Sequence, residues 1–358
     1  MTGQGKQYMI AIDGGTTNTR ARVVDLQSLT VRSTARAAVG ARNTGAQGRQ
    51  KLETATAEAV SSVLEQARVT PEQVVEVAAS GMITCEAGLL EVPHVVAPAG
   101  LREIARGSVR HLFPAIWPEP ITFVPGVKVL EKPYQSGRPV PVEQIMAQDI
   151  MRGEESETLG LLHLLKLRGP AIFVLPGSHT KLLLVDEENR ITTSLTTITG
   201  ELASTVASAT LLARSLESGG LETVDEAAAI AGFEASRRYG LGRSLFSIRL
   251  LHLLAGTTVD QRKSYLWGAL LAGDVTALEA DSRLGPLTRG ERGEVEVLIG
   301  GSDPLRSFFG LILQRWATGR PSVHVKVLVP EIVEQASAVG ATLVALEGRR
   351  TCGLEGGF

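Results

Sequence analysis

The sequence is poor in aromatic residues and cysteine and has no excess of positive charge. Its 358 residues include 8 Phe, 3 Trp and 4 Tyr, so we expect no aromatic platform for stacking nucleic-acid bases. Lys and Arg number 36 against 38 Asp and Glu, which gives a formal net charge of −2 and no basic field for a nucleic acid. The two cysteines, Cys85 and Cys352, are far apart in the sequence, which excludes a disulfide framework or a cysteine-rich metal site.

Long apolar runs and several catalytic signatures are also missing. No apolar run approaches the ~18 residues that a membrane span needs, and residues 1–7 are polar, unlike a signal peptide. We therefore expect a cytoplasmic protein with no membrane partner. The sequence contains no P-loop, no Gly-x-Gly-x-x-Gly after its first strand, no Gly-x-Ser-x-Gly elbow and no His-Glu-x-x-His helix. Its six histidines lack metal-ligand spacing.

The residues that are abundant favour an α/β enzyme. Hydrophobic residues make up 44% of the chain and charged residues 21%, so a sizeable core can form. With few aromatic residues, that core must be built from aliphatic helix–sheet packing, and the 38 glycines suit tight turns. The length is enough for two domains of the usual ~100–200 residues.

The chain opens with a pattern typical of a hairpin. A hydrophobic run at 8–13 ends in Asp-Gly-Gly-Thr-Thr-Asn, and further strands are expected at 21–25 and 29–37, which predicts an antiparallel meander. Apolar spacing and turn residues then predict helices at 51–68 and 99–109, strands at 74–79 and 121–124, and a loop over 131–148.

The same opening pattern returns halfway along the chain. After a helix at 154–167, a strand at 171–175, a turn at 176–180 and a strand at 181–186 repeat the first hairpin. Aligning Gly15 with Gly177 also places Thr16 on Ser178 and Asn18 on Thr180. We therefore predict two lobes of related architecture, at residues 1–150 and 151–358. The second lobe is completed by helices within 200–278, a strand at 295–299, a helix at 304–316, a strand at 323–329 and a helix at 331–346.

Both hairpin turns have the residues of a phosphate-binding loop. Glycines let backbone N–H groups approach an anion, threonine hydroxyls add donors, and Asp13 can hold a metal ion through water. Asp and Gly are equally typical of a plain polar turn, but their recurrence favours two hairpins that clamp a polyphosphate. Lys181 supplies a cation there, whereas His179 fits a backbone-bonded turn histidine as well as a catalytic one.

The segment 149–155, Asp-Ile-Met-Arg-Gly-Glu-Glu, allows two interpretations. As a helix start, its acidic residues Glu154 and Glu155 would complement the helix dipole. As a site, Asp149 would be a general base for a substrate hydroxyl, and Arg152 would bind an anionic group, preferably a carboxylate. The spacing alone leaves both open.

Two later turns are candidates for contact with a nucleotide. Thr199 fits a helix N-cap before Gly200, and a helix N-terminus can also bind an anion. At 300–304, Gly-Gly-Ser-Asp-Pro, the two glycines leave a flat backbone against which a nucleoside could lie. The plainer interpretation is a strand-to-helix corner, with Ser302 or Asp303 as cap and Pro304 in the first helical position.

These motifs resemble those of a known family. Residues 10–20 are similar to the first phosphate motif of the actin, sugar-kinase and heat-shock-chaperone superfamily. Residues 149–155, 175–181 and 197–202 resemble the 2-dehydro-3-deoxygalactonokinase family. The resemblance implies two ribonuclease-H-like lobes with an interlobe nucleotide cleft, and ATP and Mg²⁺ as cofactors. It also implies phosphoryl transfer to the terminal hydroxyl of 2-dehydro-3-deoxy-galactonate, in galactonate catabolism.

The resemblance also implies roles for single residues. Asp13 would organise Mg²⁺, Asp149 would be the base, and Arg152 and Glu154 would shape the sugar-acid site. Together with the turn chemistry, it gives these candidate nucleotide- and phosphate-binding residues: Gly14, Gly15, Thr16, Thr17, Asn18, Gly177, Ser178, His179, Lys181, Gly200, Gly300, Gly301 and Ser302.

Two positions depart from the family pattern. The family commonly carries tryptophan after the first aspartate and after the lysine of the second hairpin, but Gly14 and Leu182 stand here. The acceptor is therefore open, and two alternatives are kept: a kinase for another sugar on the same fold, and a non-catalytic ATP-binding regulator or chaperone-like module. The expected partners are a small sugar acid and ATP, with no nucleic acid, and a homodimer is left open.

Overall fold

The computed structural model describes residues 6–41, 48–131, 139–351 and 353. Cys352 and part of the predicted loop at 131–148 lie outside these residues.

By their contacts the residues form two compact units, which are described separately. The first unit comprises Met1–Gly169, Asp186–Thr192 and Glu331–Phe358, and the second comprises Pro170–Val185 and Thr193–Pro330. The predicted functional lobes, 1–150 and 151–358, remain a prediction, and they differ from these units chiefly at 151–169 and 331–358.

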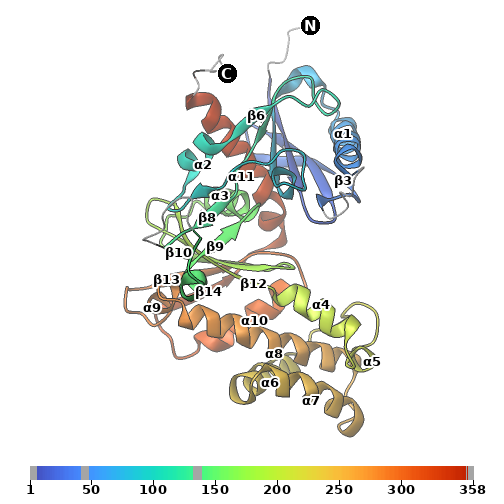
Figure 1. Ribbon diagram of the computed structural model, residues 1–358, viewed down its shortest axis with the longest axis vertical. Helices are drawn as coiled ribbons and strands as arrows, with labels where there is room; N and C mark the ends of the chain where they lie inside the picture. Colours follow the sequence, from blue (N-terminus) through green and yellow to red (C-terminus); the bar gives the residue numbers. More distant parts are fainter. Residues whose placement is uncertain (1–5, 42–47, 132–138, 352, 354–358) are drawn as a thin grey trace. The chain divides into compact units, whose positions relative to one another are not determined.

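The first unit is built on a six-stranded sheet (Figure 1). Its order is β3-β2-β1-β4-β7-β6, in which β1 is antiparallel to β2 and parallel to β4. The strands are β1 (Tyr8–Gly14), β2 (Thr19–Asp25), β3 (Thr30–Ala37), β4 (Val74–Gly81), β6 (Val109–His111) and β7 (Ile121–Phe123). A smaller sheet contains β5 (Val95–Val96), β8 (Val127–Val129) and β9 (Asp149–Met151). The helices are α1 (Gly48–Ala67), α2 (Leu101–Gly107), α3 (Glu154–Leu164) and α11 (Pro330–Thr351), with short 3₁₀ turns at Pro71–Gln73, Met82–Thr84 and Val142–Ala147.

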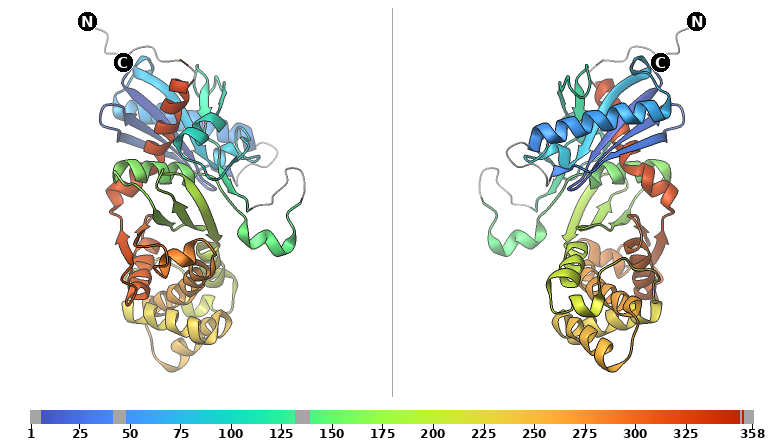
Figure 2. Two further views of the ribbon diagram at one scale, coloured as in Figure 1. Left: turned by 90° about the vertical axis from the view of Figure 1, so that its left-hand side faces the viewer. Right: turned by 90° about the vertical axis from the view of Figure 1, so that its right-hand side faces the viewer.

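Alternating side chains on the strands explain why helices cover both faces of this sheet. Ile10 and Ile12 point to one face and share a core with Leu52 and other apolar residues of α1. On the other face, Arg22 of β2 donates from Nη1 to Ser337 Oγ of α11 at 3.2 Å. Figure 2 shows α1 and α11 on opposite faces of the sheet.

Helices α3 and α11 cross with their backbones in close contact. A Cβ atom at Gly160 would collide with the carbonyl oxygen of Ala336, and one at Gly340 would collide with that of Ser156. Each helix therefore needs glycine where it meets the other, and the C-terminal helix is an integral part of the first unit.

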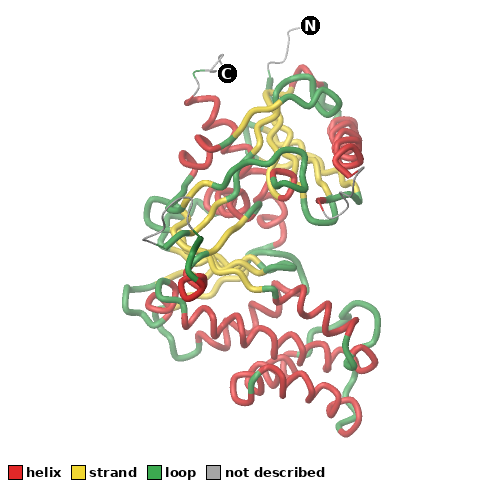
Figure 3. The backbone as a smooth tube through the Cα atoms, in the orientation of Figure 1, coloured by secondary structure: helices red, strands yellow, loops and turns green. Residues whose placement is uncertain are grey.

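The second unit contains a five-stranded sheet of order β12-β11-β10-β13-β14. The strands are β10 (Ala171–Leu175), β11 (Thr180–Val185), β12 (Ile191–Thr197), β13 (Val295–Ile299) and β14 (Val323–Val327). The helices are α4 (Thr199–Ala209), α5 (Ala213–Leu216), α6 (Glu226–Tyr239), α7 (Leu241–Leu254), α8 (Val259–Ala280), α9 (Leu284–Thr288) and α10 (Leu305–Ala317). Side chains of α6, α8 and α10 pack with Ile172, Val174 and Val297 in one core, and Figure 3 shows the helical segment beside the sheet. No helix among the described residues is long and apolar enough to cross a membrane.

Both sheets repeat one topology, which confirms the predicted α/β class and the ribonuclease-H-like repeat. Each begins with an antiparallel hairpin whose second strand neighbours the next strand of the chain, and each continues with two parallel strands beside its first strand. The turns differ by one residue, because Asp13 pairs with Arg20 across residues 14–19, whereas Leu175 pairs with Lys181 across residues 176–180. The sequence alignment based on Gly15 and Gly177 therefore holds for the incoming strands and shifts by one residue after the turns.

Candidate functional site

The first hairpin places Asp13 between two arginines. Asp13 lies near the end of β1, and its Oδ2 is 3.6 Å from Arg20 Nη1 and 3.7 Å from Arg22 Nη1. The Asp13 side chain is 24% exposed, so the carboxylate is both accessible and close to positive charge. The sequence analysis did not single out these arginines. The hairpin register could have found them, since Arg20 pairs with Asp13 and Arg22 follows on the same face of β2.

In the turn of this hairpin, two residues form hydrogen bonds within the protein and two others are exposed. Gly15 N donates to Asn18 O at 2.7 Å, and Asn18 Oδ1 accepts from Arg36 Nε at 3.1 Å. The side chains of Thr16 and Thr17 are exposed. Of the predicted phosphate-binding residues, these two threonines are therefore the most accessible in the first turn.

The end of β4 packs against this hairpin so closely that side chains are excluded. A Cβ at Gly14 would lie 2.5 Å from Ile83 Cβ, so a tryptophan in this position would not fit. Gly81 has a φ of +80°, which favours glycine. A Cβ on Gly81 would lie 3.2 Å from Asp13 Oδ1. The ends of β1 and β4 thus bring Asp13, Gly14 and Gly81 together.

The start of α3 adds two glutamates beside this group. A Cβ at Gly153 would lie 3.3 Å from Gly81 Cα, so the turn before α3 meets the end of β4. Glu155 is fully buried and accepts from Gly153 N at 2.7 Å. Burial, followed by the nearby charge of Glu154, raises the pKa of Glu155 to about 7. Burial and then the charges of Glu154 and Asp13 raise the pKa of Glu157 to about 8, although Arg22 opposes the shift.

The sequence analysis treated Glu155 as a partner of the helix dipole and passed over Glu157. A signal for the burial of Glu155 was present, because Leu159 and Leu162 follow it at helical spacing on one face. Leu161 and Leu164 follow Glu157 at the same spacing, but the charged groups around Glu157 come partly from β1 and β2 and could not be read from the sequence. Near neutral pH both side chains can hold a proton, a property that a solvated glutamate lacks.

Arg152 and Asp149 lie on the other side of the same turn. The Arg152 guanidinium donates from Nη1 to Thr84 O at 2.7 Å and from Nη2 to Val92 O at 2.8 Å, and it contacts His94 at 3.2 Å. Burial, and then the charge of Arg152, lowers the pKa of His94 to about 4. Asp149 is half-buried on β9, opposite Val129. Arg152 thus binds the loop that follows β4 at two backbone carbonyls. The substrate roles of Arg152, Glu154 and Asp149 stay predictions.

In the second unit, the second hairpin packs against the start of α4. Glu201 N donates to Ser178 O at 3.0 Å, and Gly200 leaves no room for a Cβ beside Gly177 O. His179 Nε2 lies 3.0 Å from Glu201 Oε2, and both side chains are about half exposed. Lys181 is buried, and its Nζ donates to Thr196 Oγ1 at 2.5 Å.

The turn between β13 and α10 meets the same hairpin. Gly301 has a φ of +73°, and a Cβ there would lie 2.7 Å from Pro176 O. Gly300 N donates to Val174 O at 2.9 Å. The structure therefore brings the predicted nucleoside turn, the second phosphate turn and the start of α4 together within the second unit.

Two capping predictions were wrong. Thr199 is the first residue of α4, and Ile198 occupies the N-cap position. The Thr199 hydroxyl does not cap the helix but donates to Asp274 Oδ1 at 2.6 Å. Helix α10 begins at Leu305, so Pro304 occupies the cap position and not the first helical position. The Asp303 carboxylate accepts from Ser307 Oγ at 2.6 Å and pairs with Arg306, so side chains bind it.

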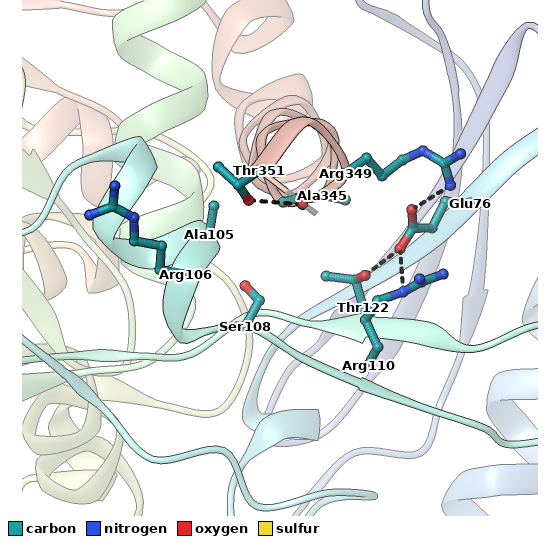
Figure 4. A pocket seen from close by; sticks show the side chains of 10 residues that line it. Glu76, Ala105, Arg106, Ser108, Arg110, Thr122, Ala345, Arg349 and Thr351 are labelled. Carbon is teal, nitrogen blue, oxygen red and sulfur yellow. Dashed lines mark hydrogen bonds and ion pairs between the residues drawn. The ribbon is translucent and has the colours of Figure 1, made fainter. Parts of the chain in front are cut away.

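A separate cavity lies in the first unit, at a different part of the sheet (Figure 4). It has a volume of about 540 Å³ and is lined by residues of α2, α11 and strands β4, β6 and β7. In this cavity the buried side chain of Glu76 has its Oε1 3.4 Å from Arg110 Nε and its Oε2 3.1 Å from Arg349 Nη1. The Thr122 hydroxyl donates to Glu76 Oε1. None of the hairpin residues lines this cavity, so it is distinct from the site around Asp13.

Known proteins resemble this chain over most of its length. The family model described as 2-keto-3-deoxy-galactonokinase matches residues 13–316. A proposed 2-dehydro-3-deoxygalactonokinase from Sinorhizobium meliloti has a similar solved structure, with a TM-score of 0.70 and 22% identity over 96% of this chain and 99% of that one. This likeness shows the fold. No curated protein matches the chain.

A weaker structural likeness extends to other proteins. A proposed N-acetylmannosamine kinase from Listeria monocytogenes matches with a TM-score of 0.44 and 15% identity, over 95% of this chain and 99% of that one. That score is too low to carry an argument. The family match, in contrast, spans most of the chain and includes the turns of both hairpins and the segment 149–155. The chain therefore belongs to the 2-keto-3-deoxy-galactonokinase family and is a carbohydrate kinase of the sugar-acid class.

Proposed function

We propose that this protein transfers the terminal phosphoryl group of ATP to the terminal hydroxyl of 2-dehydro-3-deoxy-galactonate or a closely related sugar acid. The family match over residues 13–316 carries this proposal. The accessible turns of both hairpins support it, because phosphoryl transfer depends mainly on positioning the phosphates and neutralising their charge.

The phosphates of ATP would be bound by backbone amides and short hydroxyl side chains. In the first turn, Thr16 and Thr17 offer exposed hydroxyls. In the second turn, Ser178 and His179 are exposed beside the start of α4, whose N-terminus favours an anion. Gly300, Gly301 and Ser302, which lie next to Pro176, would meet the nucleoside.

Asp13 fits the Mg²⁺ that a kinase of this family would use. Among the described residues no three His, Cys, Asp or Glu side chains form a metal cage. Mg²⁺ commonly needs only one or two carboxylates, because water and substrate phosphates supply its other ligands. The partly exposed oxygen donor of Asp13 suits that arrangement. The ion would neutralise the charge on the phosphate oxygens when bound.

Asp149 would take the proton of the acceptor hydroxyl, and Arg152 and Glu154 would shape the sugar-acid site. Arg152 would act there while it holds Thr84 and Val92, so its positive charge is fixed in place. Glu155 and Glu157 would hold protons near neutral pH, which limits the negative charge around Asp13.

The test is a coupled assay of ADP release with ATP, Mg²⁺ and a panel of aldonic acids and neutral sugars. We expect release that depends on 2-dehydro-3-deoxy-galactonate. Asp149→Asn should abolish turnover and leave ADP binding within about threefold of wild type, because a lost general base costs roughly 10²–10⁴-fold. Glu143→Gln is the matched control, since Glu143 is an exposed acid in the preceding 3₁₀ turn, and it should keep full activity.

The outcomes separate the alternatives. Flat ADP release over the whole panel would reject the kinase in favour of an ATP-binding regulator. Release with a neutral sugar alone would indicate another sugar kinase on the same fold. Normal turnover in Asp149→Asn would remove Asp149 from the mechanism and leave the overall reaction standing.

A further inference from the structure

A buried acid on α8 lies beneath the start of α4. Asp274 is 3% exposed, and its Oδ1 accepts from Thr199 Oγ1 at 2.6 Å. Thr197 Oγ1 lies 3.1 Å from Thr199 Oγ1, so three polar side chains form a short chain inside the second unit. The other carboxylate oxygen, Oδ2, is buried and has no hydrogen-bond partner among the described residues.

An acid in this position costs stability. Burial raises the pKa of Asp274 to about 6, although the hydroxyls of Thr199 and Thr197 oppose the shift. The neighbouring positions on α8, among them Leu271 and Val275, belong to the apolar core of the unit. A buried carboxylate with one unsatisfied oxygen is unfavourable for folding, and an apolar residue of similar size would be better tolerated. Core packing therefore does not explain why Asp274 is there.

The hydroxyl that Asp274 binds belongs to the turn that positions the second hairpin. Thr199 begins α4, and the next residue, Gly200, lies against the carbonyl of Gly177. Glu201 N holds Ser178 O at 3.0 Å. On the strand before the turn, Thr196 accepts from Lys181 of the hairpin. A shift of Thr199 would therefore move Gly200 and Glu201 and, with them, the turn at 177–178.

We propose that Asp274 is a positioning residue for nucleotide binding: by holding the Thr199 hydroxyl, it fixes the start of α4 and thereby the second phosphate turn. This inference rests on the proposed function, because it assumes that the turn at 177–179 binds ATP. Asp274 acts through Thr199, and it contacts neither substrate.

The test uses two variants of the full-length protein that remove the contact from either side. Asp274→Leu removes the acceptor, and Thr199→Val removes the donor with little change of shape. We expect each to weaken ADP binding, measured by isothermal titration calorimetry, and to raise the KM for ATP, both by about tenfold. The KM for the sugar acid should stay within about twofold of wild type. The melting temperature of Asp274→Leu should equal or exceed that of wild type, because a buried charge is removed.

Conservative variants serve as rescue and control. Thr199→Ser and Asp274→Asn keep a donor and an acceptor and should bind ADP within about threefold of wild type. Thr288→Val removes another buried threonine hydroxyl of the second unit, bonded to Gly285 O, and should leave ADP binding unchanged. The double variant Asp274→Leu/Thr199→Val should be no worse than either single variant, because both remove one contact.

Two results would overturn the inference. One is wild-type ADP affinity in both single variants. The other is an equal loss for ATP and for the sugar acid together with a lower melting temperature, which would mean a purely structural role. If wild type itself neither bound ADP nor released it from ATP, the proposed kinase function would fail as well, and that outcome is visible before any variant is made.

Discussion

The two hairpins share one topology and differ in their charged residues. In the first, Asp13 pairs with Arg20, and Arg22 follows on the same face. At the equivalent positions of the second hairpin, Leu175 pairs with Lys181, which is buried against Thr196. The first hairpin thus presents an accessible carboxylate beside its exposed threonines, whereas the second has no carboxylate at the equivalent position. Under the proposed function, the two equivalent hairpins therefore differ in one respect: both would contact phosphates, and the first alone would hold the metal ion.

The largest expected effect is the loss of the first hairpin's carboxylate. Asp13→Asn should reduce kcat by about 10³-fold, because the charge that would organise Mg²⁺ is removed. ADP affinity measured without Mg²⁺ should stay within about threefold of wild type. Steady-state kinetics and calorimetry check both expectations.

The equivalent position in the second hairpin provides the control. Leu175→Met conserves volume in a buried site and should keep kcat within about twofold. Similar losses in Asp13→Asn and Leu175→Met would contradict the division between the hairpins.

Two acids with raised pKa values, Glu157 and Asp274, predict different pH windows for the two units. The pKa of Glu157 is raised to about 8 in the folded chain, from an ordinary pKa of 4.5. Because the folded state binds the proton more tightly, stability falls as pH rises between these values. Glu157→Gln has no proton to lose and should raise the melting temperature by roughly 2–4 °C at about pH 8.5 but not at about pH 4.5.

In the second unit the window lies lower. The pKa of Asp274 is raised to about 6 from an ordinary pKa of 3.8. The gain in melting temperature from Asp274→Asn should therefore be complete by about pH 6.5. Melting curves of both variants between about pH 4 and pH 9 measure the two windows. A gain that is the same at every pH would show that the carboxylates do not titrate as described.

The smallest effects on activity are expected at a pair of equivalent glutamates away from the hairpins. Glu76 pairs in register with Met9, and Glu296 pairs with Ala171, so both occupy the same place in the repeated sheet. The side chain of Glu76 is 2% exposed and bound by two arginines, whereas that of Glu296 is 35% exposed and bound by Lys326.

Burial should decide how much each glutamate contributes. Glu76→Gln should cost about 2–3 kcal/mol of unfolding free energy, because it leaves arginines next to a buried uncharged group. Glu296→Gln should cost less than about 0.5 kcal/mol. Urea denaturation of both variants tests the difference, and equal costs would show that burial is not the deciding factor. Both should keep near-normal kcat.

The repeated hairpin was predictable because glycine turns between apolar runs are local features. The first meander, α1, β4 and the helices of the second unit follow from periodicity in the same way. The strand β12 was missed because its threonine-rich sequence has no clear apolar alternation. Asp274 could not be found either, since its partner Thr199 is 75 residues away in the sequence and nothing local marks the contact.

The candidate site was predictable only at the level of turns. Glycines at 14, 177, 200 and 301 lie where backbones approach each other, as their turn context suggests. The surroundings of Arg152 were not predictable, because Thr84 and Val92 come from a loop about 60–70 residues earlier in the chain. Long-range partners of charged side chains require the fold itself.

Helix α11 has a consequence for how the chain folds as it is made. Synthesis delivers the N-terminal segment first. The first unit nevertheless needs α11, which supplies Ser337 to Arg22 and packs backbone to backbone with α3. The second unit ends at Pro330, so all its residues are available before α11 is complete. The hairpin that carries Asp13 is therefore translated well before α11, yet its supporting unit is completed only when α11 has emerged.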